Sequence, residues 1–264
     1  KPELDSWISF LNKIKYPKSR VTVGLIGKYV ELKDAYKSIL EAFIHAGAYN
    51  ECKVKVELIH SENISKGSLS EHLSHLDGIL VAPGFGERGI EGKIETVKFA
   101  RENNIPFFGI CLGMQCATIE FARNVLNLKE AHTTEIEENT KEAVIYLMES
   151  QKSVTEKGGT MRLGSYACEV KKNTLAASIY KSEKISERHR HRFEFNNAYL
   201  KNFEKNGMIA SGKNPETGLV EIVEIPEHPW FVGTQFHPEY KSTVDNPHPL
   251  FVSFIGAALK KHNS

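Results

Sequence analysis

The chain has 264 residues, of which 41% are hydrophobic and 25% are charged, and its formal net charge is +1. This composition predicts a globular protein with a sizeable core, and the near-neutral charge gives no sign of a nucleic-acid or membrane partner. Four cysteines at irregular spacing form no disulfide framework, and no apolar run approaches the ~20 residues that span a bilayer. With no recognisable signal peptide, we expect a cytoplasmic protein.

Strands and helices are expected to alternate through the first half of the chain. Residues 1–18 are polar with a few apolar anchors, which predicts a short helix. Apolar runs predict strands at residues 21–26, 78–82 and 107–110, and alternation of apolar and charged residues predicts a strand at 54–59. Helices are expected after each strand, and Asp34 and Gly47 should cap and stop the first of them. This β-α order predicts a largely parallel, doubly wound sheet, whose ligands gather at the carboxyl ends of its strands.

The second half of the chain is less regular. Residues 128–165 mix acidic residues with a Gly-Gly pair and show no strong period. A closing helix is expected over residues 249–261. Strands are expected to resume at residues 166–170, 192–195, 208–212, 219–225 and 230–234.

The most informative segment is Gly109-Ile-Cys-Leu-Gly113, where an apolar run ends and an amphipathic helix begins. A sharp strand-to-helix turn presents its central residue above the sheet, and small flanking residues relieve the crowding. The helix N-terminus favours the thiolate of Cys111. Far downstream, His237 and Glu239 follow another apolar run. A lone cysteine is usually a small buried hydrophobe, but these three residues together predict a nucleophile, its base and an orienting carboxylate.

Two glycine patterns resemble nucleotide-binding loops. The run Gly84-Phe-Gly86-Glu-Arg-Gly89 matches G-x-G-x-x-G, but the next strand ends at Cys111, where a dinucleotide site needs an acidic residue. We interpret this run as a turn that offers backbone N–H groups beside Cys111. The segment at 207–213 fits G-x-x-x-x-G-K, but Asn214 replaces the hydroxyl that would bind magnesium, so the match is attributed to chance.

A histidine pair could suggest a metal site. His189 and His191 alternate with Arg188, Arg190 and Arg192. Because adjacent positive charge disfavours a bound cation, an anion or a carboxylate is the better candidate ligand, and an exposed basic strand is the simpler alternative. No metal site is expected in the chain.

Two motifs point to a family. Gly109-Ile-Cys-Leu-Gly-Met-Gln115 and Phe236-His-Pro-Glu239 resemble the motifs of class I glutamine amidotransferases. The similarity extends from about residue 7 to residue 254. The resemblance implies a three-layer α/β fold, with a doubly wound, largely parallel central sheet and a cysteine nucleophile elbow. Further segments are similar to the glutaminase domain of the CTP synthase family: residues 27–38, 89–93, 159–164 and 187–192.

The resemblance also implies a domain organisation and an activity. Residues 1–18 would be the remnant of an interdomain linker, and residues 19–264 would form the amidotransferase domain. This domain would hydrolyse L-glutamine to glutamate and ammonia through a cysteine thioester, with no cofactor of its own. The ammonia would serve an N-terminal synthetase domain, outside this sequence, that makes CTP from UTP with ATP and Mg²⁺. GTP is the expected allosteric activator, and the full enzyme is expected to be a homotetramer.

The catalytic roles are carried over by the same resemblance. Cys111 would be the nucleophile, His237 would transfer protons, and Glu239 would orient His237. The backbone N–H groups of Gly84 and Leu112 would form the oxyanion hole, the pair of donors that stabilises the negative oxygen of the tetrahedral intermediate.

One departure from the family pattern affects this hole. The family often has Pro-Gly-Gly-Phe-Gly, whereas this chain has Pro83 before Gly84; proline has no N–H, which leaves Gly84 as the donor. For the substrate, Glu135 would bind the α-ammonium and Arg192 the planar α-carboxylate. The expected glutamine-binding residues are Gly84, Phe85, Leu112, Gly113, Met114, Gln115, Glu135 and Arg192.

Two other functions remain open. A γ-glutamyl hydrolase uses a similar Cys/His arrangement but exports no ammonia. A regulatory or assembly module could keep the fold without catalysis. The linear motifs favour free glutamine as substrate, and the complete set of Cys111, His237 and Glu239 favours catalysis.

Overall fold

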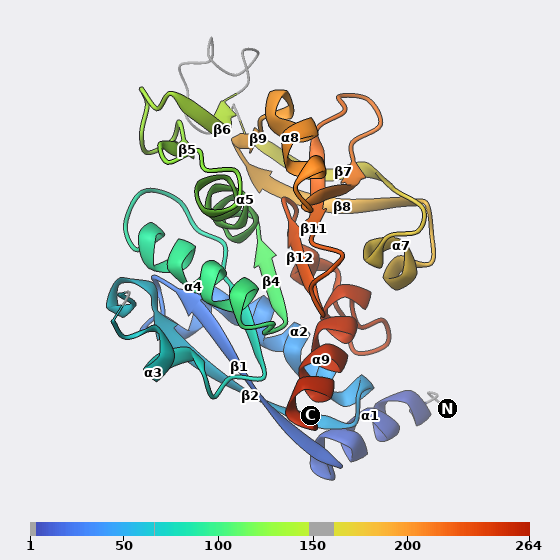
Figure 1. Cartoon of the computed structure of the whole chain (residues 1–264). Helices are drawn as coiled ribbons and strands as arrows, with labels where there is room; N and C mark the ends of the chain where they lie inside the picture. Colours follow the sequence, from blue (N-terminus) through green and yellow to red (C-terminus); the bar gives the residue numbers. More distant parts are fainter. Residues whose placement is uncertain (1–3, 66, 148–160) are drawn as a thin grey trace.

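The computed structural model describes residues 4–65, 67–147 and 161–264 (Figure 1). The first two residues of the family-like segment at 159–164 therefore lie outside the described residues. The strands are β1 (Ser19–Gly27), β2 (Cys52–His60), β3 (Gly78–Val81), β4 (Phe107–Ile110), β5 (Ala131–Thr133), β6 (Glu142–Leu147), β7 (Arg162–Val170), β8 (Lys184–His191), β9 (Phe193–Phe195), β10 (Ile209–Lys213), β11 (Val220–Glu224) and β12 (Phe231–Thr234). The helices are α1 (Asp5–Lys15), α2 (Lys37–Tyr49), α3 (Leu69–Leu73), α4 (Ile90–Glu102), α5 (Leu112–Asn124), α7 (Leu175–Tyr180), α8 (Leu200–Lys205) and α9 (Pro249–His262), with 3-10 turns η1 (Lys33–Tyr36), η2 (Ser61–Asn63), η3 (Asn197–Tyr199) and η4 (Pro238–Lys241).

The central sheet has nine strands in the order β2-β1-β3-β4-β12-β11-β10-β7-β8. The five strands from β2 to β12 pair in parallel, and the remaining strands pair antiparallel. A second, three-stranded sheet has the order β5-β6-β9. The α/β fold with a parallel core and covering helices is thus confirmed, and the antiparallel extension comes from the less regular second half of the chain.

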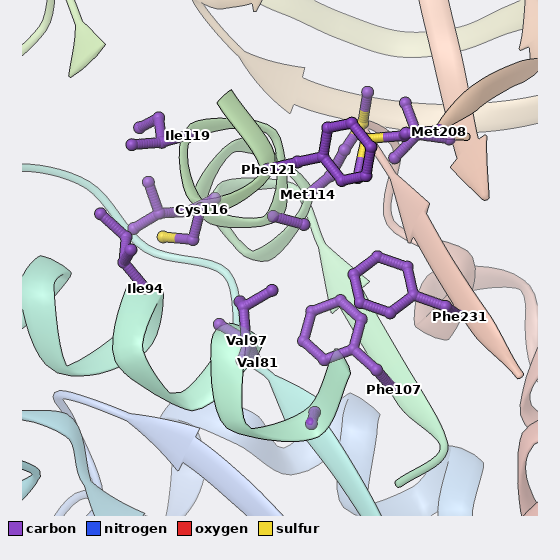
Figure 2. Packing of buried hydrophobic residues seen from close by; sticks show 14 of the residues in the cluster. Val81, Ile94, Val97, Phe107, Met114, Cys116, Ile119, Phe121, Met208 and Phe231 are labelled. Atoms are coloured by element: carbon purple, nitrogen blue, oxygen red, sulfur yellow. The ribbon is translucent and has the colours of Figure 1, made fainter. Parts of the chain in front are cut away.

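Helices cover both faces of the parallel strands, which gives the three layers (Figure 1). On one face, α4 and α5 pack against β3, β4 and β12 around Val81, Phe107 and Phe231 (Figure 2). On the other face, α2 and α9 pack around Phe43 and Phe254. Because β3, β4 and β12 are buried along their whole length, they appear in the sequence as largely apolar runs, which made them predictable, whereas the edge strand β2 alternates.

Most predicted elements are found, but two details of the first helix are wrong. Asp34 lies in η1, and no side-chain hydrogen bond caps either η1 or α2. Gly47 lies inside α2 and does not end it. A Cβ at Gly47 would stand 2.8 Å from the carbonyl oxygen of Cys52, so this glycine allows α2 to approach β2 closely.

The second half contains elements that the sequence patterns did not predict. These include β5 and β6 within the irregular segment, the whole of β8, and helices α7 and α8. Within the described ranges, no helix is long and apolar enough to cross a membrane.

Candidate active site

Four neighbouring strands end at one edge of the sheet, and each is followed by a residue of the candidate site. The strands β1, β3, β4 and β12 are adjacent and parallel. Within three residues of their carboxyl ends come Lys28, Gly84, Cys111 and His237. Residues far apart in the sequence therefore meet where a parallel sheet places its ligands.

Cys111 forms the sharp turn between β4 and α5. Its φ of 53° and ψ of −104° are strained for a residue that carries a Cβ. A Cβ on Gly113 would stand 2.2 Å from the Val81 carbonyl oxygen, and a Cβ on Gly109 would stand 2.7 Å from the Gly113 carbonyl carbon. The glycines that flank Cys111 are thus required by the close approach of α5 to β3 and β4, as the elbow pattern predicts.

His237 is oriented by a carboxylate. Its Nδ1 lies 2.8 Å from Oε1 of Glu239, and both residues are buried. Burial alone lowers the pKa of His237, but the carboxylate of Glu239 and the sulfur of Cys111 raise it well above its usual value. The other ring nitrogen, Nε2, has no hydrogen-bond partner among the described residues. The geometry is that of a general base whose free nitrogen serves a nucleophile.

Two glutamines lie behind the nucleophile. Nε2 of Gln235 donates to the sulfur of Cys111 at 3.8 Å, and Gln235 is fully buried. Nε2 of Gln115 donates to the carbonyl oxygen of Phe193 at 3.2 Å and to Oε1 of Gln235 at 3.3 Å. Both N–H donors of the Gln115 side chain are used in this way. Of its side-chain atoms, only the amide oxygen is then free for the predicted contact with glutamine.

The predicted oxyanion donors lie next to each other. A Cβ on Gly84 would stand 3.5 Å from the side chain of Leu112, the first residue of α5. In the described part of the chain, neither Gly84 nor Leu112 has a hydrogen-bond acceptor for its backbone N–H. The N–H of Leu112 is one of the donors that a helix N-terminus leaves unpaired. Two free donors on neighbouring residues, one of which follows Cys111 in the chain, suit a developing negative oxygen.

The predicted substrate-binding side chains gather in one cavity. Phe85, Glu135 and Arg192 are among the residues that line a cavity of ≈ 990 Å³. Glu135 Oε1 also accepts the N–H of Gly86 at 2.9 Å, so it holds the glycine-rich loop as well. Nε of Arg192 is buried without a partner among the described residues. Cys111 is only 3% exposed and is not one of the residues that line this cavity.

Met114 lies outside this group. Its side chain is fully buried in the cluster between α5 and the sheet, with Phe107 and Phe231 (Figure 2). Its predicted role in glutamine binding can therefore involve only its backbone. Cys116 lies in the same cluster, where burial raises the pKa of its thiol to about 12. Cys116, which lies within α5 while Cys111 precedes it, is therefore expected to stay in the neutral thiol form.

The histidine pair is part of a buried network. Nδ1 of His189 lies 2.8 Å from Nε2 of His191, and Arg162 donates to Glu194 at 3.2 Å and to Glu221 at 2.8 Å. Burial, Arg162 and His237 lower the pKa of His189 to about 3. Of the three arginines that alternate with the histidines, Arg188 and Arg190 are exposed and Arg192 is partly buried. No group of three or more His, Cys, Asp or Glu among the described residues could hold a metal ion.

Sequence reasoning missed three buried polar residues of the site: Gln235, Lys28 and Lys93. The signal for Lys93 was its position, because it lies three residues after Ile90 and four before Val97 on the apolar stripe of α4. A charged residue on an apolar stripe indicates either that the buried face of the helix was assigned wrongly or that the buried charge has a function.

Comparison with known proteins gives the family. Residues 31–257 match the family model of glutamine amidotransferase class-I. The chain is 67% identical over 257 residues to CTP synthase of Cytophaga hutchinsonii, and 61% identical over 261 residues to CTP synthase of Flavobacterium johnsoniae. These alignments cover 97% and 99% of this chain but 48% and 49% of the relatives, so the chain spans about half their length.

A solved structure agrees with these relatives. The glutaminase domain of Trypanosoma brucei CTPS with bound acivicin superimposes with a TM-score of 0.85 at 36% sequence identity. The match covers 91% of this chain and 94% of that domain. The chain therefore belongs to the class I glutamine amidotransferase family and corresponds to the glutaminase domain of CTP synthases.

Proposed function

We propose that this chain hydrolyses L-glutamine to glutamate and ammonia through a thioester on Cys111. The observation that carries the proposal is the meeting of Cys111, the His237–Glu239 pair and the free N–H groups of Gly84 and Leu112 at one edge of the sheet. These are the parts that acyl transfer requires: a nucleophile, an oriented base and oxyanion donors.

Each group has a defined step in this mechanism. His237 takes the proton of Cys111 or holds the thiolate as an ion pair, and the sulfur attacks the side-chain amide carbon of glutamine. The resulting oxyanion accepts hydrogen bonds from Gly84 and Leu112. His237 then gives its proton to the departing nitrogen, which leaves as ammonia, and a water molecule hydrolyses the thioester to glutamate.

The head group of the substrate would occupy the cavity lined by Phe85, Glu135 and Arg192. Arg192 would bind the α-carboxylate, which gives the unpaired Nε of this residue a partner. Glu135 would bind the α-ammonium with the carboxylate that also holds Gly86. Phe85 would cover the substrate from the glycine-rich loop.

The test of hydrolysis is glutamate release from L-glutamine, compared with Cys111→Ala and Cys116→Ala. We expect activity to disappear in Cys111→Ala and to persist in Cys116→Ala, because only the first sulfur lies at the strand end. Activity with γ-glutamyl peptides in place of free glutamine would favour the γ-glutamyl hydrolase alternative. A folded wild-type protein that releases no glutamate in the presence of its synthetase domain would favour the non-catalytic module.

We also propose that the ammonia serves a synthetase domain, outside this sequence, that converts UTP to CTP with ATP and Mg²⁺ in the cytoplasm, under activation by GTP. The basis is the similarity to CTP synthases about twice as long as this chain. The chain alone should form no CTP from UTP, ATP, Mg²⁺ and free ammonia, whereas a separately prepared synthetase domain should. CTP formed by the chain alone would overturn this division of labour.

A further inference from the structure

A buried lysine lies beside the loop that carries the oxyanion donor. Lys93, in the first turn of α4, is 1% exposed. Its ammonium donates to the carbonyl oxygen of Ala82 at 2.9 Å. A Cβ on Gly84 would stand 3.7 Å from Nζ of Lys93, so the ammonium adjoins the donor residue as well.

The charge of Lys93 is not neutralised locally. Among the described residues, no carboxylate lies within ion-pair distance of its ammonium, and the groups whose charges act on it include Lys28 and the thiols of Cys111 and Cys116. A buried ammonium without a counter-ion carries a large cost in lost solvation. A neutral donor would satisfy the Ala82 carbonyl equally well, so the hydrogen bond alone does not explain a charge at this position.

Other contacts fix the loop on both sides of Gly84. Lys28, which is also buried, donates to the carbonyl oxygen of Phe85. The N–H of the same peptide unit donates to Glu135 at 2.9 Å. Lys93 holds the peptide unit on the other side, between Ala82 and Pro83. The backbone before and after Gly84 is thus held, while the N–H of Gly84 has no acceptor in the described part of the chain.

The position of α4 is itself tightly defined. A Cβ on Gly92, the residue before Lys93, would stand 1.8 Å from the carbonyl oxygen of Ser61. The helix backbone therefore lies directly against η2, and Lys93 projects from a fixed point. Burial lowers the pKa of Lys93 to about 8, so the group is mainly cationic at neutral pH.

We propose that Lys93 is a positioning residue for glutamine hydrolysis: its buried ammonium orients the Gly84 N–H through the Ala82 carbonyl and places a positive charge where the oxyanion forms. This inference rests on the proposed glutaminase function. The bound amide of glutamine carries no negative charge, whereas the tetrahedral intermediate does. The positive charge of Lys93 should therefore stabilise the transition state more than it stabilises the bound substrate.

The test compares Lys93→Met with Lys98→Met, the same change on a less buried face of the same helix. Glutamate release should fall in Lys93→Met through kcat, by on the order of 10- to 100-fold, below the ~10²–10³ typical for loss of a direct oxyanion donor. KM should stay within a few-fold. Lys98→Met should resemble the wild type. Methionine has a similar volume and removes the cost of a buried charge, but it leaves the Ala82 carbonyl oxygen without this donor. Because the two effects oppose each other, the unfolding midpoint of Lys93→Met should change little.

A second measurement separates this role from a general loss of the site. Alkylation of Cys111 by iodoacetamide forms no tetrahedral oxyanion, so Lys93→Met should slow it much less than it slows glutamine turnover. Unchanged kcat, an equal loss in alkylation and turnover, or a loss of kcat that follows a lowered unfolding midpoint would each overturn the proposal. A wild-type protein without glutaminase activity would instead refute the proposed function on which the inference rests.

Discussion

Replacement of Gly84 by proline tests the oxyanion hole directly. The substitution removes one N–H and adds a side chain. The Cβ of a residue at this position would contact Leu112, Lys28 and Lys93 at 3.5 to 3.7 Å, which are ordinary van der Waals distances. The Cβ is therefore accommodated, and what proline adds beyond it is the loss of the N–H and the ring atoms that replace it. Loss of one such donor typically lowers kcat by ~10²–10³, or about 2.7–4 kcal/mol in the activation free energy.

Gly84→Ala is the matched control, since it adds the same Cβ but keeps the N–H. The two variants should be compared by initial rates of glutamate release, with circular dichroism and thermal unfolding to verify the fold. We expect kcat of Gly84→Ala to stay near the wild-type value, that of Gly84→Pro to fall, and KM to change little in both. If a folded Gly84→Pro variant kept the kcat of Gly84→Ala, the oxyanion hole would have to be formed by other groups.

Three further predictions concern other residues of the site. A glutamine-analogue electrophile should add its mass to Cys111 and not to Cys116, whose buried thiol has its pKa raised to about 12; equal labelling of both would contradict the assignment. Arg192→Ala should raise KM with little change in kcat, because its partner is the non-reacting carboxylate; an unchanged KM would exclude that contact. Glu239→Gln removes the carboxylate that holds the pKa of His237 well above its usual value, so the alkaline limb of the kcat/KM profile should move to lower pH. Because the folded-state pKa of His237 is raised, its stabilising effect is complete below ~6.5, the unfolded value, and is lost as pH rises through the folded value. Glu239→Gln should therefore destabilise the protein more at pH 6 than at pH 9, and equal losses in urea unfolding at the two pH values would be evidence against the ion pair.

The parallel half of the fold was predictable because its signals are local. Strands covered on both faces form continuous apolar runs, and the helices between them carry apolar stripes. The elbow was predictable for a similar reason, since the crowding around Cys111 acts on its neighbours Gly109 and Gly113. The prediction that Gly47 ends the helix was wrong because this glycine is needed for the close approach of α2 to Cys52.

Strand β8 shows why the antiparallel half was harder to predict. It does alternate with a period of two, but both of its faces are mainly polar, with Ile185 as its one apolar residue. Glu187, His189 and His191 are buried, and the residues between them are mostly exposed. The partners that bond Glu187 come from other elements: Tyr180 is near it in the sequence but lies in α7, and His248 is 61 residues away. A hydrophobicity pattern cannot reveal a buried polar face whose partners are remote in the sequence.

The reacting groups of the candidate site could be predicted from the sequence, but the residues that hold these groups in place could not. Cys111, His237 and Glu239 belong to short motifs, so their types and spacing carried the prediction. Lys93 and Gln235 contact the Ala82 carbonyl oxygen and the Cys111 sulfur only in the folded chain. The place of Lys93 on an apolar stripe marks it as unusual, but no local pattern reports either contact.

Buried polar atoms without hydrogen-bond partners gather at the site, which indicates that the site is organised before the substrate binds. Nε2 of His237, Oε2 of Glu239 and Nε of Arg192 are buried without partners among the described residues. Each such atom costs roughly 1–3 kcal/mol unless a partner or water satisfies it. Cys111 adds strained backbone angles at the same edge of the sheet. A substrate that satisfies Arg192 and accepts from Gly84 would relieve part of this cost, so binding of a non-hydrolysable glutamine analogue should raise the unfolding temperature by more in the wild type than in Arg192→Ala.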